Sequence, residues 1–141
     1  MLVPLFGLKK IDAIDFATLV RPTSPNTFLV CPASFSLAEA DQEAPIFPHS
    51  RDTLISAWVD LIRNQTRTVE IVTSGDGFQR TFVQRTRFAG FPDVITVQFI
   101  ALSTETCTLA VYSRSQYGRS DFGANKKRVT AWLSDLGDLL G

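Results

Sequence analysis

The chain has 141 residues, of which 45% are hydrophobic and 20% are charged. These proportions are typical of a soluble globular domain with one core, and they exclude an intrinsically disordered chain. The 14 basic residues balance the 14 acidic residues, so no overall charge attracts nucleic acid, and we expect no nucleic-acid partner.

The N-terminal residues Met1–Leu8 are largely apolar and are followed by Lys9 and Lys10. This run is too short to cross a bilayer, and its charges follow it, which is the reverse of a secretory signal peptide. We therefore predict no membrane span in this chain and, from the N-terminus alone, a cytoplasmic location. We assign residues 1–14 to an N-terminal extension and residues 15–141 to a single domain.

The segment from Val20 to Pro48 contains five prolines and one short apolar run, Thr27–Cys31. Proline fixes φ and removes a backbone donor, so the segment should be extended or turning, with at most one short strand. Cys31 and Cys107 are the two cysteines, and they either form a disulfide or remain two buried thiols.

His49 is the single histidine and stands at a predicted helix start. A histidine-based zinc site or a Ser-His-Asp triad would have to use this one residue, so we expect no metal and no cofactor.

Regular periodicity begins after Ser50, a plausible N-cap for an amphipathic helix from Arg51 to Asn64. A second amphipathic helix is predicted from Gly123 to Leu140. Between the two helices lie four strand-like runs separated by turn residues, namely Thr66–Ser74, Phe78–Phe88, Val94–Leu102 and Cys107–Ser113.

Short consecutive strands joined by tight turns form antiparallel neighbours, and two amphipathic helices supply an apolar surface to cover one face of them. The predicted fold is therefore a two-layer α+β domain in the order β-α-β-β-β-β-α. Its curled antiparallel sheet would have four or five strands, with both helices on one face. Such an architecture can leave an apolar cavity between the sheet and the helices.

The junction between the last strand and the last helix, Ser113 to Arg128, concentrates small, polar and cationic residues. Its basic residues outnumber its one acidic residue, Asp121; they are Arg114, Arg119, Lys126, Lys127 and Arg128. Because backbone N–H groups and the positive end of a helix dipole meet at such a turn, an anion can bind there.

The same stretch resembles the signature of the bacterial and plastid family called domain of unknown function 1499, R-S-x-S-R-x-G-x-S-D-x-G-x-N-x-x-R-V. The matching residues are Ser113, Ser115, Gly118, Ser120, Asp121, Gly123, Asn125, Arg128 and Val129. Pro22–Asn26 and Phe88–Asp93 also resemble this family, so the similarity covers most of the chain from Asp15 on. Tyr112 and Gln116 depart from it, because the family often has arginine there. Since members are frequently membrane-anchored or exported, the resemblance leaves an envelope location open.

Six residues of the junction have a structural interpretation. Asp121 caps the helix, while Gly118 and Gly123 shape the turn. Asn125 and Arg128 share a helix face and turn toward the strand end that carries Ser113, with Arg128 paired to Asp121 or to strand carbonyls.

A second interpretation is functional. It predicts a non-catalytic binding or interaction module for an anionic or amphipathic, lipid-like small molecule at this junction. The predicted ligand-binding residues are Arg114, Ser115, Tyr117, Arg119 and Ser120. The alternative is a hydrolase-like enzyme in which Asp121 acts as general base beside Ser113, Ser115 or Tyr117, although an activated serine normally needs an adjacent base. The sequence does not indicate the oligomeric state.

Overall fold

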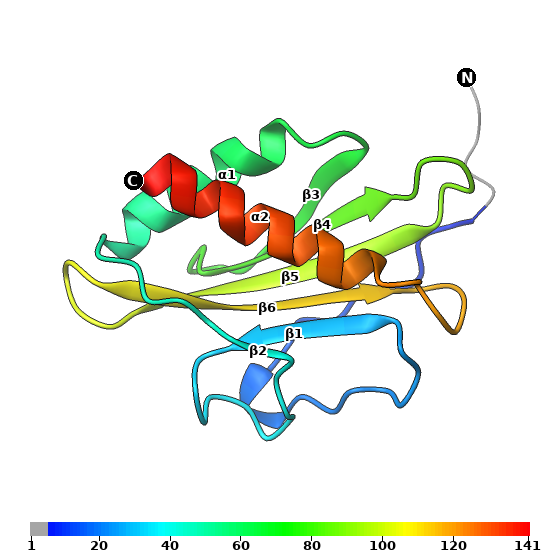
Figure 1. Ribbon diagram of the computed structural model, residues 1–141, viewed down its shortest axis with the longest axis horizontal. Helices are drawn as coiled ribbons and strands as arrows, with labels where there is room; N and C mark the ends of the chain where they lie inside the picture. The colour runs from blue at the N-terminus through cyan, green and yellow to red at the C-terminus, as the bar shows by residue number, and fades with distance from the viewer. Residues whose placement is uncertain (1–5) are drawn as a thin grey trace.

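A twisted sheet carries both long helices on one of its faces (Figure 1). The computed structural model describes residues 6–141. The fold is α+β, as predicted, and η1 denotes a short 3-10 helix. The elements in chain order are η1 (Phe16–Thr18), β1 (Thr27–Cys31), β2 (Gln42–Glu43), α1 (Arg51–Arg63), β3 (Thr68–Thr73), β4 (Gln79–Arg85), β5 (Pro92–Ala101), β6 (Cys107–Ser115) and α2 (Ala124–Leu140).

Both helices begin where the sequence places polar residues that satisfy free backbone donors. The Ser50 hydroxyl accepts a hydrogen bond from the Thr53 N–H over 3.2 Å, which caps α1. Helix α2 begins after Gly123, whose φ of +83° suits glycine. Within residues 6–141, no helix combines the length and the apolar character needed to cross a membrane.

The sheet has six strands in the order β2-β1-β6-β5-β4-β3. The four strands β3 to β6 form the expected antiparallel meander, and β1 pairs with β6 antiparallel. The predicted sheet of four or five antiparallel strands is nevertheless wrong in two respects, because β2 adds a sixth strand and pairs with β1 in parallel. The segment 32–41 brings the chain back beside β1, where the Ala44 N–H donates to the Cys31 carbonyl over 2.8 Å. A two-residue strand has too few positions for an alternating pattern, so tertiary contacts alone define it.

The main core fills the space between the helices and the sheet. Trp58 of α1 lies at its centre, with ring centroids 6.2 Å from Phe82, 6.1 Å from Phe99 and 5.9 Å from Trp132 of α2. All four side chains are buried. These rings fill the space between the sheet and the helices where an apolar cavity was expected. Dense aromatic packing therefore holds the two layers together.

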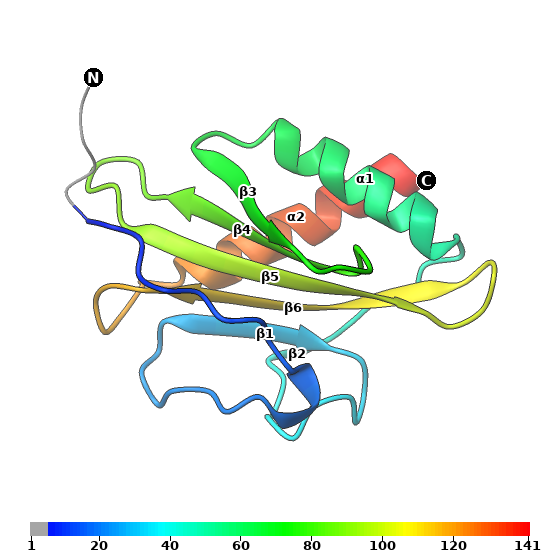
Figure 2. The same cartoon turned by 180° about the vertical axis from the view of Figure 1, so that it is seen from behind.

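The opposite face of the sheet has a second, smaller core. The chain before β1 crosses this face, as Figure 2 shows, and Phe16 packs there with Leu29, Cys31, Ala110 and Tyr112. Cys107 belongs instead to the main core on the helix face. Both cysteines are therefore free buried thiols, and burial raises the pKa of Cys31 to about 11.

Two glutamine side chains attach the N-terminal segment to the sheet. Gln79 accepts from the Ile14 N–H over 3.1 Å and donates to the Ile14 carbonyl over 2.7 Å. Gln116 pairs with the Lys9 N–H and carbonyl in the same manner, over 2.9 and 3.1 Å. Each amide thus substitutes for a neighbouring strand and satisfies the extended backbone. Residues 6–14 lie against the domain rather than apart from it.

Candidate functional site

The positive, N-terminal end of helix α2 is capped by a carboxylate of the chain itself. The Asp121 carboxylate accepts hydrogen bonds from the Gly123 N–H over 2.8 Å and from the Asn125 N–H over 3.1 Å. Asp121 therefore caps α2 from two residues before the N-cap. Because these donors are already satisfied, an external anion at this junction would have to be bound mainly by side chains.

Strand register places polar residues side by side under the start of α2. Asp93 of β5 stands opposite Gln84 of β4 and opposite Ser115 of β6. Arg128 reaches this row from α2, and its Nη2 lies 2.6 Å from Asp93 Oδ2 while its Nε donates to Gln84 Oε1 over 2.6 Å. The side chains of Arg128 and Asp93 are only 7% and 2% exposed, so they form a buried ion pair.

Asn125 connects this pair to the rest of the junction. Ser113 donates to Asn125 Oδ1 over 2.6 Å, and Arg128 donates to the same oxygen over 2.9 Å. The Asn125 amide nitrogen donates to the Asn26 carbonyl over 3.0 Å and to Asp121 over 2.7 Å. We call this set the junction network; its members are Asn26, Gln84, Asp93, Ser113, Ser115, Asp121, Asn125 and Arg128.

The junction network joins three strands and the residue before β1 to one helix. Three of its members, Asn26, Gln84 and Asp93, were not among the predicted site residues. Asp93 and Gln84 lie on strands far from the junction in sequence, and the resemblance of Phe88–Asp93 to the family was the one signal that pointed to Asp93. The partner of Arg128 is Asp93, whereas the sequence suggested Asp121 or strand carbonyls.

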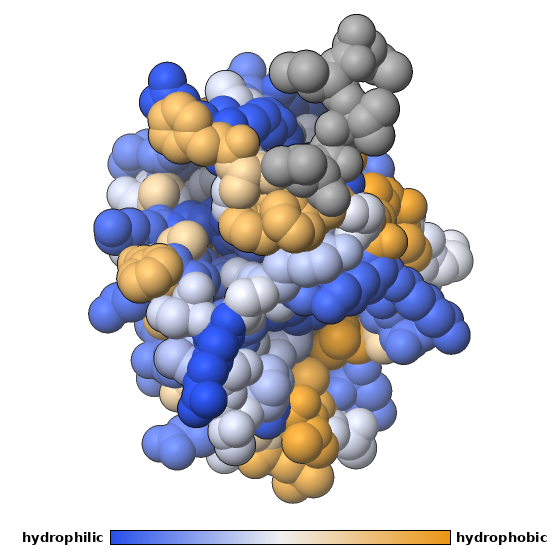
Figure 3. Space-filling model, turned by 90° about the vertical axis from the view of Figure 1, so that its right-hand side faces the viewer, coloured by the Kyte–Doolittle hydropathy of each residue, from blue (hydrophilic) through white to orange (hydrophobic). Residues whose placement is uncertain are grey.

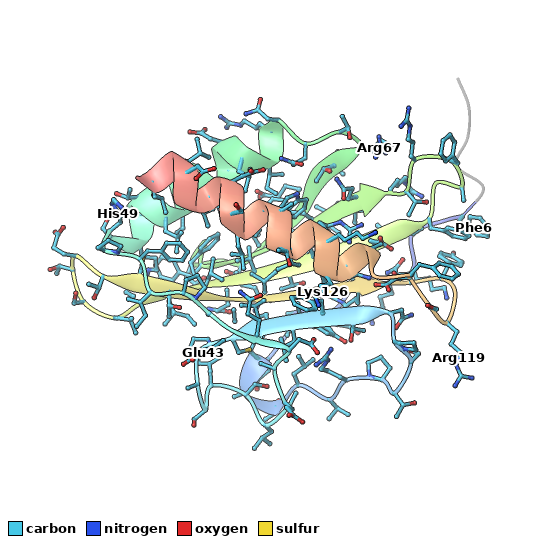
Figure 4. All side chains as sticks on the ribbon, in the orientation of Figure 1. Phe6, Glu43, His49, Arg67, Arg119 and Lys126 are labelled. Atoms are coloured by element: carbon cyan, nitrogen blue, oxygen red, sulfur yellow. The ribbon has the colours of Figure 1, made fainter. Side chains whose placement is uncertain are left out.

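The surroundings of Asp121 do not favour general-base chemistry. Burial raises the pKa of this carboxyl, but hydrogen bonds from Asn125 and from the Gly123 N–H more than offset burial, so the pKa lies below its ordinary value. A carboxylate stabilised in this way is a weak base. His49 lies at the opposite end of the molecule from Arg119 (Figure 4), so it cannot activate a junction serine.

Arg114 lies on the other face of the sheet from Ser113 and Ser115, because side chains alternate along a strand. Its guanidinium donates to Thr96 Oγ1 and to the Tyr112 carbonyl, each over 3.1 Å, and stands 4.9 Å from the centre of the Tyr112 ring. Burial lowers the pKa of Arg114 to about 10, which keeps the side chain protonated at neutral pH.

The other predicted ligand residues are also dispersed. Ser115 belongs to the junction network. Tyr117 packs against Phe6 and donates its hydroxyl hydrogen to the Gly7 carbonyl over 2.6 Å. Arg119 is exposed and points away from the domain in Figure 4. The structure therefore does not gather the predicted ligand-binding residues at one place.

One of the predicted ligand-binding residues, Ser120, lines a groove of about 770 Å³ beside the junction, together with the predicted structural residues Asp121 and Gly123. Its lining comes from the proline-containing segment before β1, from β1 and β2, and from the start of α2. Polar side chains dominate its lining, which comprises Arg21, Pro22, Thr23, Ser24, Pro25, Thr27, Phe28, Asp41, Gln42, Ser120, Asp121, Gly123 and Lys126.

The charged side chains that line the groove differ in whether they already have hydrogen-bonding or ionic partners within the chain. Arg21 pairs with Asp41 over 2.6 Å, and Asp41 also accepts from the Leu29 N–H over 2.8 Å. Asp121 is engaged by the α2 donors described above. Lys126 is exposed and lies between α2 and β1 (Figure 4). Among the described residues, no carboxylate pairs with the Lys126 ammonium group.

Sequence reasoning missed Arg21, Ser24 and Lys126 as groove residues. The likeness of Pro22–Asn26 to the family and the surplus of basic residues near Lys126 were the available signals. Neither signal indicates that the two segments meet across one groove. Within residues 6–141, no three His, Cys, Asp or Glu side chains lie close enough together to hold a metal ion.

Comparison with known proteins gives one clear result. The sequence profile of a family described as "Protein of unknown function (DUF1499)" matches residues 20–136. No curated protein is significantly similar in sequence. A solved structure of a START superfamily protein from Mycobacterium smegmatis aligns with a TM-score of 0.38 and 11% sequence identity, over 70% of this chain and 91% of that chain. A resemblance at this level carries no argument about ligand or function.

Proposed function

Because this chain belongs to DUF1499, a family of proteins of unknown function, we propose a function from the geometry of the site. The domain is a non-catalytic binding module, and its groove beside the β6–α2 junction holds the anionic group of a small polar ligand.

The observation that carries this proposal is that the charged side chains of the groove differ in whether the chain itself supplies their partners. Both of its carboxylates are occupied by donors of the chain itself, whereas Lys126 has no carboxylate partner among the described residues. Although the formal charges of Arg21, Lys126, Asp41 and Asp121 sum to zero, the Lys126 ammonium group is, among the described residues, the charged group of the groove that has no hydrogen-bonding or ionic partner in the chain, so it is free to contact a ligand anion. The hydroxyls of Ser24 and Ser120 lie in the same lining and supply neutral donors for a phosphate or carboxylate oxygen.

Two features support binding over catalysis and a polar ligand over an apolar one. The lowered pKa of Asp121 gives a poor base, and the single histidine lies at the other end of the molecule. The aromatic side chains at the centre of the main core leave an acyl chain no evident place between the layers. The main core therefore offers no site for the apolar chain of an amphipathic, lipid-like ligand, and the proposal is restricted to a polar, anionic one.

A thermal-shift titration tests the proposal. Inorganic phosphate and citrate are added to the wild type, to Lys126→Ala and to Lys127→Ala at constant ionic strength. Lys127 is an exposed neighbour on α2 that is absent from the groove lining, so it controls for the loss of one positive charge.

We expect a saturable rise in the melting temperature of the wild type and of Lys127→Ala with at least one of the two anions. Removing a charged donor should weaken binding by about tenfold or more in Lys126→Ala. The proposal is wrong if neither anion gives a saturable rise, or if both lysine variants respond like the wild type.

A further inference from the structure

The zero net charge of the chain conceals a separation of charge along its long axis. At one end, the connecting segments 64–67, 86–91 and 116–123 carry the exposed residues Arg67, Arg87 and Arg119. Their one acidic residue, Asp121, is held by hydrogen bonds from α2. We call this the basic end, and Figure 4 labels Arg67 and Arg119 there.

The opposite end is acidic. The turns 74–78 and 102–106 and the last residues of α2, 134–141, contain no lysine or arginine; their charged residues are Asp76, Glu105, Asp135 and Asp138. The start of α1 adds Arg51, whose guanidinium stacks 3.4 Å from the centre of the Phe78 ring, and Asp52, so acidic residues still outnumber basic ones at this end. A protein with this distribution presents a positive surface at one end while its total charge stays at zero.

The order of charged residues along helix α2 adds to this separation of charge, although that order is unfavourable for the stability of the helix. Its first turns carry Lys126 and Lys127, its last turns carry Asp135 and Asp138, and it has no acidic residue in the first turn and no basic residue in the last. A helix dipole favours the reverse arrangement. The charge order of α2 is therefore not explained by helix stability.

The basic end also exposes two phenylalanines. Phe88 lies in the β4–β5 connection and is 92% exposed, and Phe122 lies in the β6–α2 connection and is 91% exposed. Phe122 adopts a φ of +53°, a left-handed conformation that is costly for a bulky residue. Neither ring is packed in the core, so the fold gains little from either.

The two connections belong to adjacent parts of the same surface. They leave neighbouring strands at the same end of the sheet, where Asp93 pairs with Ser115 and the Gln116 N–H donates to the Pro92 carbonyl over 3.3 Å. Figure 3 looks onto this end and shows separate apolar patches among hydrophilic side chains.

We propose that the basic end docks on the surface of an anionic lipid bilayer, with Phe88 and Phe122 entering the interface and the arginines contacting lipid headgroups. Aromatic side chains among cations are what peripheral attachment to anionic lipid requires. This goes beyond the proposed function, since Phe88, Arg87 and Arg119 are outside the groove lining.

A bilayer fits these observations better than a nucleic acid does. Binding of single-stranded nucleic acid relies on aromatic platforms along a cationic groove that tracks the phosphate backbone. Here each ring stands on its own connecting segment with more than nine-tenths of its surface exposed. Protruding rings of this kind suit insertion into a soft interface.

Vesicle co-sedimentation of the full chain tests the proposal. The probes are vesicles of phosphatidylcholine alone and vesicles of equal parts phosphatidylcholine and phosphatidylglycerol, in low and high salt. The variants are Phe88→Ser and Phe122→Asn, the second of which keeps the fold because asparagine tolerates a positive φ. Leu37→Ser is the matched control, because Leu37 is 85% exposed in the segment between β1 and β2.

We expect salt-sensitive binding to the anionic vesicles and little binding to the neutral ones. Each phenylalanine variant should weaken this binding by about tenfold, Arg119→Ala by about fivefold, and Leu37→Ser not at all. The proposal is overturned if the anionic vesicles are not bound, or if the phenylalanine variants bind them as well as the wild type. It is also overturned if single-stranded nucleic acid, but not vesicles, binds through the same residues. Phosphate binding by Phe88→Ser, measured in parallel, separates a failure here from a failure of the groove.

Discussion

The buried pair of Arg128 and Asp93 connects α2 to the centre of the sheet, and the Arg128 guanidinium also donates to Gln84, Ser113 and Asn125. An ion pair of this kind contributes little net stability when both partners are present, but breaking it leaves a buried charge without compensation. Its main effect is therefore to specify how α2 sits on the sheet.

Asp93→Ala is predicted to lower the free energy of unfolding by about 3–5 kcal/mol, because the Arg128 guanidinium would remain buried without its carboxylate. Urea denaturation measures this change. The control is the double variant Asp93→Ala with Arg128→Met, which should lose clearly less than the sum of the two single variants. Additive losses would show that the two side chains are not coupled.

Asp121 should make stability depend on pH in the acidic range. Its pKa is lowered in the folded state, so its carboxylate stabilises the fold above the ordinary aspartate pKa of about 3.9. This contribution is lost as the pH falls through the lower, folded-state value. Asp121→Asn should therefore be less stable than the wild type at neutral pH, and the difference should shrink in acid. Denaturation curves across this range would refute the account if the difference stayed constant.

Individual residues of the site could be predicted only where local chemistry determines their role. Asp121 and Gly123 act within a few residues of their own position, and capping and φ preferences describe both. Arg114 was assigned to the ligand on charge alone, and strand alternation places it on the opposite face from Ser113. Asp93 and Arg21 take their roles from partners in distant segments, and although a family resemblance pointed to Asp93, nothing in one sequence indicates which segments meet.

Among the elements, α2 offers a direct test of the charge order along its length. Lys127→Glu and Asp138→Lys should each raise the free energy of unfolding by about 0.3–1 kcal/mol, because each places the favourable charge at a helix end. Thermal denaturation at low salt measures this gain. Only Lys127→Glu, which lies near the basic end, should also reduce binding to anionic vesicles. A loss of stability in both variants would contradict the argument about α2.

The sequence predicted the elements with strong periodicity and missed those that only tertiary contacts define. The strand Thr27–Cys31, both helices and the four-strand meander were expected within a few residues of their bounds. Strand β2 and helix η1 are two and three residues long, too short for a periodic pattern. The second core was missed because Phe16 and Tyr112 come from segments whose pairing cannot be derived from either segment alone.

At the scale of the whole molecule, the predicted domain boundary before residue 15 separates the N-terminal extension, residues 1–14, from the rest of the chain. The described part of this segment is bound through Gln79 and Gln116, and the Phe6 ring stacks on Phe91 at a centroid distance of 4.3 Å. We propose that residues 15–141 form the folding unit and that the preceding segment adds stability to it.

A chain of residues 15–141 should fold, with a free energy of unfolding about 1–3 kcal/mol lower than that of the full chain. Circular dichroism with urea denaturation measures the difference, and Gln116→Ala in the full chain should reproduce part of it. Failure of the shortened chain to fold would show that the N-terminal segment is integral to the domain.

The central claim is that the groove between the segment before β1 and the start of α2 binds an anion through Lys126. The most direct measurement is a ¹H–¹⁵N correlation titration with inorganic phosphate. The account predicts saturable shifts of amides that line the groove, Ser24, Ser120 and Lys126 among them, and their loss in Lys126→Ala but not in Lys127→Ala. Shifts that never saturate, or that cluster around Arg114 on the other face of the sheet, would contradict it.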